Sequence, residues 1–108
     1  MLTDVVIESL GGSQRVRIKC KDCVRKIAVY DALIAVQLRD CIAIYERVPA
    51  DGGGTAYQLK ARLQYSRNCD LLVVSSSHLT ICDKHKLRCF NFGGVQCVLY
   101  TVCTVFTV

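Results

Sequence analysis

The glycines of this 108-residue chain divide it into short segments. All 7 glycines lie in three clusters, at residues 11–12, 52–54 and 93–94, and glycine clusters of this kind mark turns. Other segments are separated by two-residue linkers at 31–32 and 39–40. Such short linkers join antiparallel neighbours, because a parallel crossover needs about a dozen residues or more. The spacing therefore predicts an all-β fold built as an antiparallel meander.

The segments between the turns have the composition and the alternation of strands. Val, Ile and Thr make up 27 of the 108 residues, and branched Cβ atoms pack well on a pleated sheet. We expect strands at residues 4–10, 14–20, 25–30, 33–38, 41–47, 56–64, 70–75, 78–83 and 86–92. The side chains that we expect to be buried in the central segments are Ile27, Val29, Ile34, Val36, Ile42 and Ile44.

An internal repeat narrows the architecture. A shift of about 45 residues aligns Ile27 with Leu72, Val36 with Ile81 and Tyr45 with Phe90. A period of about 40–45 residues with four strands per unit is typical of a WD-type propeller blade. Residues 27–64 form one complete unit, residues 4–20 the last two strands of the preceding unit, and residues 70–92 the first three of the next. The repeat predicts a partial WD40-type β-propeller of about two and a quarter blades.

Three runs of sequence carry a resemblance to a known family. They are TDVVIESL (residues 3–10), VRIKCKDCVRKIAVYDALIAVQLRDCIAIYE (16–46) and NCDLLVVSSSHLTICDKHKLRCFNFGGV (68–95). Together they resemble the intraflagellar transport protein 122 family. Members of this family are WD-repeat subunits of intraflagellar transport complex A. The resemblance implies a partial propeller in residues 1–95 of a short fragment or truncated form. Residues 96–108 (QCVLYTVCTVFTV) lie beyond the match and are expected to form a divergent apolar tail.

The resemblance also implies a function. It predicts a non-enzymatic scaffold module that supports retrograde ciliary transport, cilium assembly and protein localisation to cilia. The implied partners are other complex A subunits and cargo adaptors, with no nucleic acid and no direct membrane insertion. The implied locations are the cilium, the ciliary base, the cytoplasm and the cytoskeleton.

The 8 cysteines raise a different possibility, a small cysteine-rich β domain that binds zinc or nucleic acid. Cys20 and Cys23 form a C-x-x-C pair, and tetrahedral zinc would need a second pair. The candidates for that second pair are His78, Cys82, His85 and Cys89. Because the resemblance places Cys20 and Cys23 on a different blade from Cys82 and Cys89, we expect core or loop cysteines and no metal site or cofactor.

Catalytic and phosphate-binding patterns are weak. Residues 75–78 (SSSH) place hydroxyls beside an imidazole, but a triad needs a third group from elsewhere, so we expect a polar turn. The glycines at 52–54 lack the Lys-Ser/Thr of a phosphate-binding loop and are expected to form a flexible loop. The alternating cations Arg15, Arg17, Lys19 and Lys21 are expected on a solvated strand face. The sequence thus predicts no catalytic residue.

Overall fold

The computed structural model describes residues 3–8, 11–12, 14–84 and 86–101. These residues form ten strands and no helix. The described part of the chain therefore contains no helix that could span a membrane. The strands are β1 (Asp4–Glu8), β2 (Arg15–Lys19), β3 (Lys26–Tyr30), β4 (Leu33–Gln37), β5 (Cys41–Pro49), β6 (Thr55–Gln64), β7 (Leu71–Val74), β8 (His78–Asp83), β9 (Lys86–Asn91) and β10 (Gln96–Thr101). The predicted all-β class is confirmed.

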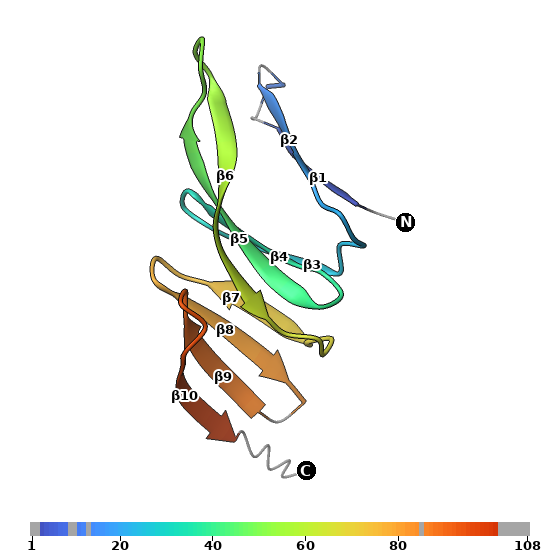
Figure 1. Ribbon diagram of the computed structural model, residues 1–108, viewed down its shortest axis with the longest axis vertical. Helices are drawn as coiled ribbons and strands as arrows, with labels where there is room; N and C mark the ends of the chain where they lie inside the picture. The colour runs from blue at the N-terminus through green and yellow to red at the C-terminus, as the bar shows by residue number, and fades with distance from the viewer. Residues whose placement is uncertain (1–2, 9–10, 13, 85, 102–108) are drawn as a thin grey trace.

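The strands form three antiparallel sheets that follow one another along the long axis of the molecule (Figure 1). The first sheet holds β1 and β2, the middle sheet has the order β3-β4-β5-β6, and the third has the order β10-β9-β8-β7. In the middle sheet the short turn after β3 is closed by Asp31, which has a positive φ of 50°. Asp tolerates this conformation better than most residues because its side chain bonds locally. This is the arrangement of successive propeller blades that the repeat predicts.

The middle sheet is covered on both faces. One face, which includes Ala35 and Ile44, packs against Leu79 and Ile81 of the third sheet. The opposite face, which includes Val36, packs against residues of the first sheet. All five residues of β4 are buried, because the strand lies inside its own sheet and between two other sheets. The predicted burial of Ile34, Val36, Ile42 and Ile44 is confirmed.

The predicted burial of Ile27 and Val29 is wrong. Their side chains are 49% and 67% exposed, although both lie on β3 and pair with buried residues of β4. Strand β3 is the edge of the middle sheet. An apolar cluster joins the first sheet to the middle sheet. Of the middle sheet, it includes residues of β4, β5 and β6 but none of β3. Nothing in the described part of the chain therefore covers this face of β3.

The third sheet has one strand more than the sequence indicates. The sequence predicts three strands in this unit, whereas β10 adds a fourth, antiparallel to β9, with an irregularity in the pairing between Gln96 and Val98. The first six residues of the expected tail are thus strand residues, and residues 102–108 lie outside the described part. The boundary between propeller and tail at residue 95 stays a prediction.

Candidate interaction surfaces

The contact between the middle and third sheets is the main apolar junction of the molecule. Leu79 and Ile81 are 0% and 1% exposed, and they pack against a cluster that includes Ile42, Ile44 and Leu63. Full burial of such a side chain stabilises by about 1.5–3 kcal/mol. The two blades therefore hold each other through side chains that neither sheet could bury alone.

A buried amide fixes the chain between these two blades. Gln37, at the end of β4, is 0% exposed. Its Nε2 donates a hydrogen bond to the Arg67 carbonyl at 2.7 Å, and its Oε1 accepts one from the Cys69 thiol at 3.1 Å. Both partners lie in the linker from β6 to β7. The amide thus ties the middle sheet to the segment that begins the next blade.

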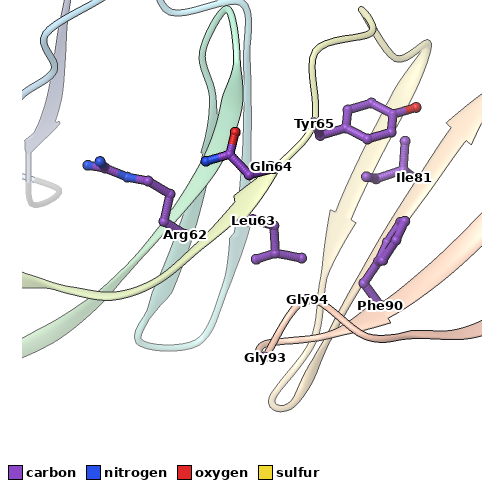
Figure 2. Close-up of a pocket in the computed structure, with 8 residues that line it drawn as sticks. All are labelled: Arg62, Leu63, Gln64, Tyr65, Ile81, Phe90, Gly93 and Gly94. Carbon is purple, nitrogen blue, oxygen red and sulfur yellow. The ribbon is translucent and has the colours of Figure 1, made fainter.

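A cleft of about 290 Å³ opens where β6 meets the third sheet (Figure 2). Leu63, Ile81 and Phe90 line it between the sheets, whereas the side chain of Arg62 points away from them. The hydroxyl of Tyr65 is buried here and makes no hydrogen bond with the described residues. Burial raises the pKa of this phenol, and Asp83 adds to the rise, whereas Arg88 opposes it. The cleft can hold an apolar side chain, but its lining includes no nucleophile paired with a base.

The first sheet presents a charged face to solvent. Arg15 pairs with Glu8 at 3.3 Å, and Arg17 pairs with Asp4 at 3.7 Å, both between exposed side chains. Such exposed pairs contribute about 0–1 kcal/mol. The predicted solvated face is confirmed, and acids of β1 partly neutralise its cations.

The proposed zinc ligands are spread over separate parts of the fold. Cys20 is buried in the cluster between the first two sheets, whereas Cys82 and Cys89 lie on β8 and β9 of the third sheet. His85 lies outside the described residues. Among those described, no group of three or more His, Cys, Asp or Glu is arranged to hold a metal ion. The structure therefore does not bring the C-x-x-C pair together with its proposed second half.

Two thiols have environments that alter their acidity. Burial raises the pKa of Cys20, and a hydrogen bond with Tyr45 partly opposes the rise. Burial also raises the pKa of Cys69, while Lys26 lowers it. A raised pKa keeps a thiol protonated and weakly nucleophilic at neutral pH. The expected core position is thus confirmed for Cys20 and Cys69 only. The other described cysteines are half-buried or exposed: Cys23, Cys41, Cys82, Cys89 and Cys97.

The two remaining sequence candidates lie in turns. Residues 75–78 join β7 and β8, where the Ser75 amide donates to the His78 carbonyl at 2.8 Å. Ser77 Oγ lies 2.6 Å from His78 Nδ1, and no acid among the described residues pairs with this imidazole. Residues 52–54 lie in the loop between β5 and β6, all with positive φ. The polar turn and the glycine loop are where the sequence places them.

Neither the role of Gln37 nor the cleft at Tyr65 is predicted from the sequence. Residues 33–38 (LIAVQL) contain one polar side chain in an apolar run, and a buried polar group needs a partner. That pattern could have drawn attention to Gln37. The cleft has no comparable signal, because its walls come from β6, β8, β9 and the turn before β10.

Comparisons with known proteins agree with this architecture. The model of a family described as the IFT122 second beta-propeller matches residues 1–102. Curated relatives named intraflagellar transport protein 122 homolog include those of Homo sapiens and Danio rerio, each 40% identical over 95 residues, and that of Mus musculus, 39% identical over 95 residues. The match covers 88% of this chain and 8% of each relative. The chain therefore belongs to the IFT122 second beta-propeller family.

Proposed function

We propose that this chain serves as a non-enzymatic scaffold module of an intraflagellar transport complex A subunit. The observation that carries the proposal is the match to the second propeller of the family over residues 1–102. A propeller of this kind acts through the surfaces that it presents to other proteins. Its blades are held by apolar packing, as at the junction of Ile44 with Ile81.

The names of the relatives support a role in intraflagellar transport in general, and we propose a finer role within it. We place the module in retrograde transport, cilium assembly and the delivery of proteins to cilia. Its partners are then other complex A subunits and cargo adaptors, and its locations are the cilium, the ciliary base, the cytoplasm and the cytoskeleton. The relatives are much longer than this chain, which matches 8% of each.

A segment exchange tests this function. The 95 matched residues of the human relative are replaced by the corresponding residues of this chain, and the hybrid is expressed in ciliated cells that lack the endogenous protein. We expect the hybrid to co-precipitate with complex A subunits and to restore cilium formation. A stable hybrid that neither enters the complex nor restores cilia would refute the scaffold role.

A matched pair of variants separates folding from function in the same hybrid. Val36 is 0% exposed, so Val36→Asp buries a charge without a partner and is expected to abolish assembly. Val95, which is 61% exposed in the turn before β10, accepts the same substitution at the surface. Val95→Asp should therefore assemble like the parent hybrid. Normal assembly of Val36→Asp would show that the blade assignment is wrong.

A further inference from the structure

Four connections lie at the same edge of the sheets. Because all neighbouring strands are antiparallel, the segments after β2, β4, β6 and β8 gather on one side, at the right of Figure 1. We call this edge the loop face and define it by residues 20–25, 38–40, 66–70, 83–84 and 86. The turns after β3, β7 and β9 lie at the opposite edge.

The loop face concentrates positive charge that has no local partner. Five of its cations are exposed and form no ion pair with the described residues: Lys21, Arg25, Arg67, Lys84 and Lys86. Two of its four carboxylates are already engaged. Asp22 pairs with Arg39 at 3.7 Å, and Asp70 accepts a hydrogen bond from the Lys84 amide at 2.8 Å. Asp40 and Asp83 are the other two acids.

The opposite edge has the reverse charge. Its turns, at residues 31–32, 75–77 and 92–95, contain Asp31 and no Lys or Arg, and the β5–β6 turn at 50–54 contains Asp51 and likewise no Lys or Arg. The loop face, with six cations and four carboxylates, is thus weakly positive, the turns of the opposite edge are weakly negative, and the remaining cations lie along the strands between them. A difference in charge between two edges helps to orient an incoming charged partner.

The loop face is also hollowed at its most basic part. A depression of about 630 Å³ lies between the β6–β7 linker and residues at the end of β8 and the start of β9. Its lining residues are Arg67, Asn68, Asp83, Lys84 and Lys86. We infer that this depression binds an acidic segment of a protein partner, with carboxylates near Arg67, Lys84 and Lys86.

The shape and composition favour a peptide over the other polyanions. A depression suits a chain that enters it, whereas a lipid bilayer offers a broad surface. The loop face has no aromatic side chain, and single-stranded nucleic acids bind largely through base stacking on aromatic residues. Asn68 adds an amide that can pair with a peptide backbone. The inference rests on the proposed function in one respect, namely that the partner is a protein.

Peptide binding to the full 108-residue chain tests the inference. The probe is a fluorescein-labelled peptide of alternating glutamate and glycine, measured by fluorescence anisotropy. Lys84→Glu together with Lys86→Glu should weaken binding about tenfold, and the Gln versions should be intermediate. The control, Arg17→Glu together with Arg47→Glu, makes the same change in net charge away from the depression. It should stay within about twofold of the parent.

Circular dichroism must show that the variants keep the strand content of the parent. If the double Glu variant loses strand content, the double Gln variant provides a second, milder test. Equal weakening by the control pair, or no binding of the peptide by the parent, overturns the inference. Stronger binding to phosphatidylserine vesicles or to oligothymidylate than to the peptide also overturns it. If the hybrid assembles normally while the peptide fails to bind, the inference falls and the proposed function stands.

Discussion

Replacing Gln37 by Met should loosen the joint between the middle and third blades. Met keeps the length of the side chain but removes both the 2.7 Å bond to the Arg67 carbonyl and the 3.1 Å bond from the Cys69 thiol. A typical hydrogen bond contributes about 0.5–1.5 kcal/mol net, and a buried group left without a partner costs about 1–3 kcal/mol. The thiol is a weak donor, so the carbonyl dominates. We therefore expect a loss of about 2 kcal/mol in local stability.

Amide hydrogen exchange measures this loss where it occurs. The reporter is the Asp70 amide, which donates to the Cys82 carbonyl at 2.8 Å directly after the linker. A loss of about 2 kcal/mol corresponds to roughly 30-fold faster exchange when the amide exchanges through local opening. The control is the Asn91 amide, which is bonded to the Val95 carbonyl at 2.9 Å at the other edge of the third sheet. Its rate should not change.

If the Asp70 amide exchanges at the parental rate in the Gln37→Met variant, the buried amide does not hold the linker. A uniform increase at both reporters would indicate global destabilisation instead. In either case the role assigned to Gln37 would be wrong.

Three further predictions follow from the packing, the backbone and the acidity of the thiols. In the 108-residue chain, Ile34→Ala should lower the free energy of unfolding by about 2–5 kcal/mol, because it leaves a cavity. Ile27→Ala, at a position that is 49% exposed, should lower it far less in urea unfolding. Equal effects would contradict the assignment of β3 as an uncovered edge. Asp31→Val should destabilise by about 1–2 kcal/mol because a branched residue cannot easily hold a positive φ, whereas Asp31→Gly should be nearly neutral in thermal unfolding. Iodoacetamide should modify Cys20 more slowly than exposed Cys97 at neutral pH, because burial raises the pKa of Cys20. The rate of Cys20 modification should increase as the pH rises. Mass spectrometry that finds Cys20 modified first would contradict this prediction.

Local sequence determined where the strands and turns lie. The alternation around Ile18, the glycine clusters and the two-residue linkers specify short strands and tight turns, because these preferences act over only a few residues. The 45-residue repeat then indicated blades. It placed Ile42 and Ile44 in the core correctly, because their strand, β5, has a neighbouring strand on each side.

Tertiary structure decided which strand faces are covered by another sheet. Ile27 and Val36 are directly paired across β3 and β4, yet one is half exposed and the other fully buried. No local pattern distinguishes them, because burial depends on whether another sheet lies over that strand. The same holds for Gln37, whose partners are 30 and 32 residues away in the chain. The sequence by itself therefore determined β1 to β9 of this protein but not β10. Only the stacking of the sheets decided the buried contacts, because such contacts join residues that are distant in sequence.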